Sequence, residues 1–128
     1  LNSIRQNLSQ DFIPVLYTSR EIIAPRDNND LIQFQLFLSA FISEIVSAIK
    51  NEIGYLISKG GITTNTIISD GLGADSVYLE GQILPGISLV TFNLFKQKGK
   101  LPIVTFPGNI GNDMSLVKVL EILENKNF

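Results

Sequence analysis

The sequence predicts a single α/β domain with a mixed, mostly parallel sheet and helices on both faces. Three observations predict it. The first half alternates strand-like and helical segments, which is typical of a parallel sheet with covering helices. The second half holds three apolar strand-like segments in succession. A chain of 128 residues that is 45% hydrophobic and 17% charged is long enough to bury one core.

The first two elements are a helix end and a strand. Residues 1–10 are typical of the end of a helix, and residues 12–19 (FIPVLYTS) predict a strand with a proline near its start. A loop through residues 25–30 follows, because it combines Pro25 with polar residues.

A long helix is predicted over residues 31–50. Apolar residues recur there at helical spacing, and they are Leu31, Phe34, Leu38, Phe41, Ile42, Ile45 and Ile49. Asn28, Asn29 and Asp30 are suitable N-cap residues. A membrane span has about the same length, roughly 20 residues. Polar interruptions favour a helix packed on a sheet instead, and they are Gln33, Gln35, Ser39, Ser43, Glu44 and Ser47.

The remaining elements follow from apolar runs and turn residues. A strand at residues 54–58 leads to a short helix at residues 64–70 that ends at Gly71 or Gly73. Strands are predicted at 76–83, 87–95 and 101–106, and the closing helix at 113–125. Their connections are the turn LPGI at residues 84–87, where Pro85 and Gly86 fit a type II turn, and KQKGK at residues 96–100.

Composition excludes several kinds of chemistry. The net charge is −2 and there is no histidine or cysteine, so the sequence gives no reason to expect nucleic-acid binding, a disulfide, a thiolate nucleophile or a zinc cluster. We predict no metal site made by the protein. The isolated acidic residues Glu44, Asp70, Asp75 and Glu80 are expected on the surface.

Two glycine loops follow apolar strands and precede helices. The first is Gly60-Gly61-Ile62-Thr63, and the second contains Gly108, Asn109 and Gly111. Ligands bind at such places in open sheets, because unpaired amides at helix starts attract anions such as phosphate. The alternative for the first loop is a tight turn with Thr63 or Thr64 as N-cap. Asn112 or Asp113 is the expected cap after the second loop.

Four motifs in order resemble one family. They are YTS at residues 17–19, SKGGITTNTI at 58–67, GQILPGIS at 81–88 and LPIVTFPGNIGND at 101–113. Together they are similar to the C-terminal nucleotide-binding domain of the four-carbon acid sugar kinases. The resemblance covers nearly all of residues 1–128. It implies that the chain is the nucleotide-binding part of a larger two-domain kinase.

The resemblance also implies a function and site residues. The whole protein would be an ATP-dependent phosphotransferase acting on threonate, erythronate or oxo-tetronate. ATP would contact Ser19, Gly60, Gly61, Ile62, Thr63, Gly108, Asn109 and Gly111, with Mg²⁺ held mainly by the phosphates. Phe106 stands where the family commonly has a polar residue. The sugar-acid pocket and the catalytic residues would lie in an N-terminal domain whose D-D-x-T-G type motif does not occur here.

A non-catalytic alternative uses the same loops. The chain would then be a regulatory module that binds a nucleotide or another small anion. A homo-oligomer is compatible with both hypotheses, and neither involves nucleic acid or a membrane. The sequence begins with Leu1 rather than methionine and shows neither a basic segment nor an apolar core typical of a signal peptide, which leads us to expect a piece of a longer cytoplasmic protein.

Overall fold

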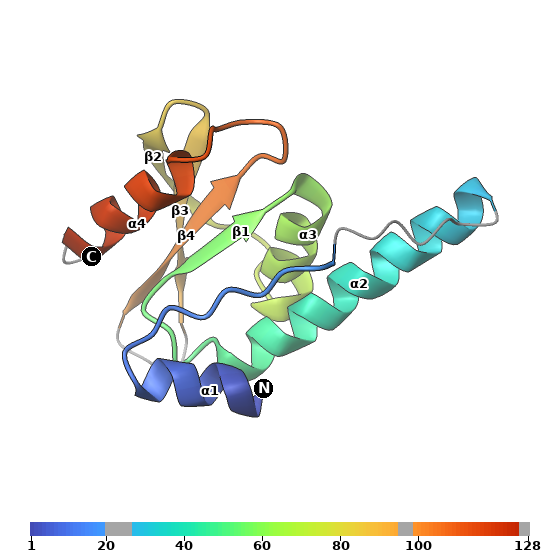
Figure 1. Ribbon diagram of the computed structural model, residues 1–128, viewed down its shortest axis with the longest axis horizontal. Helices are drawn as coiled ribbons and strands as arrows, with labels where there is room; N and C mark the ends of the chain where they lie inside the picture. Colours follow the sequence, from blue (N-terminus) through green and yellow to red (C-terminus); the bar gives the residue numbers. More distant parts are fainter. Residues whose placement is uncertain (20–26, 95–98, 126–128) are drawn as a thin grey trace.

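A four-stranded mixed sheet forms the centre of the protein (Figure 1). The computed structural model describes residues 1–19, 27–94 and 99–125. The strands are β1 (Leu56–Lys59), β2 (Tyr78–Leu84), β3 (Ile87–Asn93) and β4 (Lys100–Phe106), in the order β1-β4-β3-β2. The α/β class is therefore confirmed.

The prediction of a mostly parallel sheet is wrong. Within the described residues, β1 and β4 are parallel, whereas β3 is antiparallel to both β2 and β4. The connections explain the difference, because a parallel crossover needs about a dozen residues or more. Pro85 and Gly86 alone join β2 to β3, and residues 94–99 join β3 to β4. Both links are too short for a crossover.

Helices cover both faces of the sheet, as predicted. On one face, Val119 and Leu123 of α4 (Ser115–Asn125) pack with Val104 and Phe106 of β4. On the other face, Ile67 of the π-helix η1 (Ile67–Gly71) packs with Ile103 and Phe92. α3 (Gly61–Thr66) runs directly into η1, so the short helix begins three residues earlier than the sequence predicted.

The long helix α2 (Asn28–Ile49) confirms the predicted helix but buries a different face. Its buried residues are Ser39, Ser43, Val46 and Ile49, and it packs principally on α3 and η1. Small side chains allow this close packing: a Cβ on Gly71 would stand 3.0 Å from the carbonyl oxygen of Ser43. The N-cap is Asp27, whose side chain accepts a hydrogen bond from the Asp30 amide at 2.9 Å.

The N-terminal half of α2 projects beyond the rest of the molecule (Figure 1). Leu31, Phe34 and Phe41 of the predicted apolar stripe are exposed. The helix is long and apolar enough to cross a membrane by length and composition, and 22% of that stretch is buried inside the protein.

The predicted strand at residues 12–19 is wrong. Although the sequence there is apolar and extended, no backbone hydrogen bond joins residues 13–19 to another described residue. A strand requires a pairing partner as well as a suitable sequence, and the described part of the chain supplies none here. Phe12, Val15 and Tyr17 are consequently exposed.

The other predicted elements are present. The helix at the N-terminus is α1 (Asn2–Ser9), and its Arg5 forms an ion pair with Glu52 at 2.8 Å. Gly86 has a φ of +77°, as the third position of a type II turn requires. Residues 28–30 of the predicted loop at residues 25–30 form the start of α2, while residues 20–26 and 95–98 lie outside the described residues.

Candidate functional site

Two glycine loops lie next to each other at one edge of the sheet. The parallel strands β1 and β4 end in register, with Lys59 opposite Phe106. Gly60 and Gly61 continue from the first strand, and Pro107 and Gly108 continue from the second. The Gly60 amide donates a hydrogen bond to the Phe106 carbonyl oxygen at 2.9 Å. The two loops that the sequence singled out are thus joined at their bases.

Lys59 forms a second link between the loops. Its Nζ donates hydrogen bonds to the carbonyl oxygens of Pro107 at 3.1 Å and Gly108 at 3.0 Å. The same atom lies 4.7 Å from the centroid of the Phe106 ring, within the range of a cation–π contact. A positive charge therefore stands beside the second loop, next to the Phe106 ring. The charge comes from the neighbouring strand.

The first loop begins at a backbone position with positive φ. Gly60 has a φ of +101° and precedes the first residue of α3, a conformation that other residues rarely adopt. Thr64 turns inward, where its hydroxyl pairs with Ser58 Oγ at 2.8 Å. Thr63 instead faces α2, with its Oγ1 3.5 Å from Ser39 Oγ. The turn is tight, as the alternative interpretation required, but no side chain caps α3.

Gly61 and Gly108 have no structural reason to be glycine within the described residues. Neither has a positive φ, and a Cβ built on either would have no described heavy atom within 4 Å beyond its own chain neighbours. Glycine at a helix start loses more conformational entropy than alanine. Open space above two adjacent loops is the feature expected where a ligand approaches the backbone closely.

The second loop is fixed by packing around Phe106. Gly111 has a φ of +99°, and a Cβ there would stand 2.9 Å from the Phe106 ring. Asn112 then caps the following turn, because its Oδ1 accepts a hydrogen bond from the Met114 amide at 3.0 Å. Ile110 contacts the hairpin turn, where a Cβ on Gly86 would meet its Cδ1 at 3.1 Å. Three of the four sequence motifs therefore meet at this edge.

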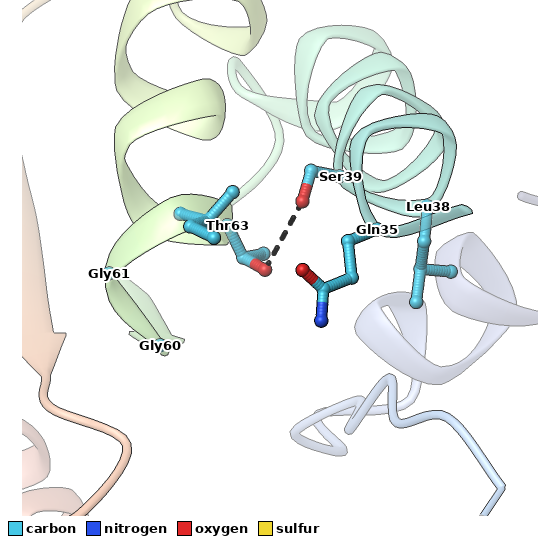
Figure 2. A pocket seen from close by; sticks show the side chains of 7 residues that line it. Gln35, Leu38, Ser39, Gly60, Gly61 and Thr63 are labelled. Atoms are coloured by element: carbon cyan, nitrogen blue, oxygen red, sulfur yellow. Dashed lines mark hydrogen bonds between the residues drawn. The ribbon is translucent and has the colours of Figure 1, made fainter. Parts of the chain in front are cut away.

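A pocket of about 260 Å³ opens between the first loop and α2. Figure 2 shows the side chains of Gln35 and Ser39 beside Thr63, with Leu38 farther from Thr63 on the same helix. The lining residues are Gln35, Leu38, Ser39, Gly60, Gly61, Ile62 and Thr63. Four of them were predicted from the sequence. The three from α2 were missed, and the signal that could have found them is a pair of polar residues, Gln35 and Ser39, one turn apart in an apolar helix.

The remaining predicted residues lie elsewhere. Gly108, Asn109 and Gly111 belong to the second loop and do not line this pocket. Ser19 is exposed at the end of residues 12–19 and does not line it either.

The acidic residues Glu44, Asp70, Asp75 and Glu80 are all exposed, as expected. Within residues 1–19, 27–94 and 99–125, no group of three or more acidic side chains is placed to hold a metal ion.

Comparison with known proteins identifies the domain. Residues 1–116 match the family described as a nucleotide-binding C-terminal domain. No curated protein matches the sequence.

Two solved structures share the fold. Both are crystal forms of a domain of unknown function (DUF1537) from Bordetella bronchiseptica, described as a domain-swapped dimer with bound citrate. The TM-scores are 0.67 and 0.63 at 16% and 18% sequence identity. The alignments cover 99% and 98% of this chain, which spans 31% of the length of those proteins.

The four motifs resembled the C-terminal nucleotide-binding domain of the four-carbon acid sugar kinases, and this comparison confirms the resemblance. The family match extends over most of the chain and includes both glycine loops. The protein therefore belongs to the nucleotide-binding C-terminal domain family.

Proposed function

We propose that this chain binds ATP at the edge where β1 and β4 end, as the nucleotide-binding part of a kinase for a four-carbon sugar acid. Gly60 to Thr63 and Gly108 to Gly111 would hold the phosphates through their backbone amides. Gly61 carries the proposal, since neither its φ nor its packing requires glycine. A phosphate that approaches the main chain closely would require it.

The charges beside the loops also support a phosphate ligand. Lys59 is exposed and already lies against the second loop, where an ammonium group would stabilise bound phosphate oxygens. The family's nucleotide-binding description agrees with this assignment. Mg²⁺ would be held largely by phosphate oxygens and water, a common arrangement for this ion in phosphoryl transfer.

The proposed reaction needs more protein than this chain. ATP would supply the γ-phosphoryl group, and the residues described here would bind and orient it. The sugar acid and its catalytic base would come from the remainder of a longer protein, in keeping with the 31% of the related proteins that this chain spans. Catalysis would then depend on how the two parts position the phosphoryl group and the hydroxyl.

The binding step is tested by ligand-dependent stability and one matched pair of variants. MgATP at about a hundred times its Kd should stabilise the wild-type chain by roughly 2.7 kcal/mol. In Gly61→Val, the side chain would occupy the space that we assign to phosphate, so this shift should disappear. Gly54→Val is the control, because Gly54 also has open space around it but precedes β1 at the opposite end.

Isothermal titration calorimetry should show that wild type and Gly54→Val bind MgATP more tightly than Gly61→Val does. Equal MgATP binding by wild type and a folded Gly61→Val variant would contradict the proposal.

The kinase step needs the full-length protein, assayed for ADP release with MgATP and threonate or erythronate. ATP binding without turnover of any four-carbon sugar acid would leave the non-catalytic module as the better description.

A further inference from the structure

The pocket between the first loop and α2 contains polar side chains that phosphate binding by backbone amides does not use. Gln35 and Ser39 both line it, and Thr63 faces them from the first loop (Figure 2). Residues four apart lie on the same face of a helix, so α2 presents an amide and a hydroxyl to the pocket together. The Gln35 amide forms no hydrogen bond with another described residue.

The hydroxyls of Ser39 and Thr63 also retain the capacity to bind a ligand. Their oxygens are 3.5 Å apart, which is longer than the roughly 2.5–3.0 Å of a typical hydrogen bond between hydroxyls. Ser58 and Thr64 form a contrasting pair, which is buried and only 2.8 Å apart. Each hydroxyl can donate one hydrogen bond and accept two. A ligand hydroxyl near Ser39 and Thr63 would therefore gain partners without breaking a strong contact.

The two sides of the first loop differ in charge. On the side of the second loop, Lys59 Nζ donates to the carbonyl oxygen of Gly108 at 3.0 Å. On the α2 side, the described residues that line the pocket are all uncharged, and residues 31–43 contain no charged side chain. ATP has the same asymmetry, with charged phosphates at one end and an uncharged nucleoside at the other. The charges thus favour phosphates beside Lys59 and the nucleoside beside α2.

The size and chemistry of the pocket suit the sugar of a nucleotide. Its volume of about 260 Å³ lies below the roughly 300–1,000 Å³ of sites that enclose a whole drug-sized ligand, so it would hold only part of ATP. A four-carbon sugar acid also has hydroxyl groups, but it carries a carboxylate, and the described lining residues supply no cation. The uncharged diol of ribose needs none.

We propose that Gln35, Ser39 and Thr63 bind the ribose hydroxyls of ATP and make the domain selective for ribonucleotides. The Gln35 amide both donates and accepts hydrogen bonds, as each hydroxyl of a diol does. Leu38 and Ile62 complete the lining with apolar surface, which suits the adjoining base. This inference rests on the proposed ATP site and extends it from the phosphates to the sugar.

The test compares two glutamines of the same helix. Gln33 is exposed like Gln35, but it does not line the pocket, because two residues correspond to about 200° around a helix. Calorimetric titration with MgATP should show Gln35→Leu binding about two- to tenfold more weakly than wild type, the effect of one lost hydrogen bond. Gln33→Leu should bind as wild type does. Circular dichroism checks that both variants are folded.

Two further kinds of ligand separate ribose binding from phosphate binding. Wild type and Gln33→Leu should bind MgATP more tightly than its 2′-deoxy or 3′-deoxy analogue, and Gln35→Leu should lose that preference. Magnesium tripolyphosphate has no ribose, so wild type and both variants should bind it equally. An equal loss of tripolyphosphate and MgATP affinity in Gln35→Leu would indicate a structural role and overturn the assignment.

Other results would also overturn it. Equal affinity of wild type for ATP and both deoxy analogues would remove the ribose contact but leave the ATP site intact, as would equal MgATP binding by Gln35→Leu and Gln33→Leu. Threonate binding that Gln35→Leu abolishes would assign the pocket to a sugar acid instead. Absence of MgATP binding by wild type would overturn the proposed function, and the ribose assignment with it.

Discussion

Gly111 and Gly61 lie at the same edge of the sheet, but the fold requires glycine at only one of these two positions. Gly111 needs its positive φ and its lack of a Cβ, because the Phe106 ring lies where the Cβ would stand. Gly61 needs neither within the described residues. The fold therefore requires glycine at position 111, whereas at position 61 only the proposed ligand requires it.

We therefore expect opposite changes in stability from two alanine substitutions. Gly111→Ala should lower the free energy of unfolding by about 1–3 kcal/mol, because the strained backbone and the contact with Phe106 both oppose it. Gly61→Ala should raise the same quantity by roughly 0.4–1 kcal/mol, because alanine restricts the unfolded chain and suits a helix start. Urea denaturation without nucleotide measures both. A loss of stability in Gly61→Ala would indicate a structural role for Gly61.

The motifs made several residues of the site predictable. Gly60, Gly61 and Thr63 line the pocket. The sequence indicated them because a glycine pair after a strand has few structural explanations. Gln35, Leu38 and Ser39 were not predictable, because their contribution depends on how α2 packs beside the loop. The position of Lys59 on the second loop was equally hidden, because it follows from the register of β1 and β4. The ATP contacts themselves stay predictions.

Among the elements, α2 and η1 depend on an unusually close approach. Ser43 Oγ donates a hydrogen bond to the Thr66 carbonyl oxygen at 3.3 Å, and Lys50 Nζ donates to the carbonyl oxygen of Gly71 at 3.1 Å. The helix backbones can meet because serine and glycine occupy the contact. Ser39 and Ser43, which looked in the sequence like interruptions of an apolar helix, are two of its four buried residues.

Gly71→Ala should be destabilising for this reason. The added Cβ would lie 3.0 Å from the Ser43 carbonyl oxygen and 3.2 Å from its hydroxyl, and a small overpacking of this kind costs about 1–3 kcal/mol. Gly54→Ala serves as the control, since no described heavy atom lies near its added Cβ and a change within about 0.5 kcal/mol is expected. Thermal and urea denaturation report the difference. Equal stability of the two variants would argue against tight packing.

Local sequence predicted most elements but not how they pair. The boundaries of β3 and β4 follow from runs of apolar residues, and the hairpin from Pro85 and Gly86. The strand expected at residues 12–19 failed because pairing depends on distant parts of the chain, which propensity does not describe. The prediction that the apolar stripe of α2 is buried was wrong for a related reason, since Phe34 and Phe41 are apolar but exposed among the described residues.

At the scale of the whole molecule, ion pairs connect segments that are distant in sequence and should make stability depend on acidity. Hydrogen bonds from Thr91, and then from Lys100, lower the pKa of Glu80. A hydrogen bond from Arg5 likewise lowers the pKa of Glu52, which ties α1 to the end of α2. Because each carboxyl titrates lower in the folded chain, its stabilising effect is present above its ordinary pKa of 4.5 and is lost as the pH falls below that value.

The contribution of Glu80 can be isolated. In Glu80→Gln the free energy of unfolding should decline less steeply between neutral pH and the acid range than in the wild type, because one carboxylate that must be protonated is absent. Glu44→Gln provides the comparison, because Glu44 is exposed and forms no ion pair among the described residues. Urea denaturation across pH 3 to 7 measures the slopes. Identical curves for Glu80→Gln and wild type would show that the contacts of Glu80 do not persist in solution.

The helix α2 has one further consequence. Gln35 and Ser39 line the pocket from the same turns of α2 that carry the exposed Phe34 and Phe37. A contact on these rings that moves this half of the helix would therefore also move one wall of the pocket. By linkage, occupation of the pocket would then change the affinity of that contact by the same factor.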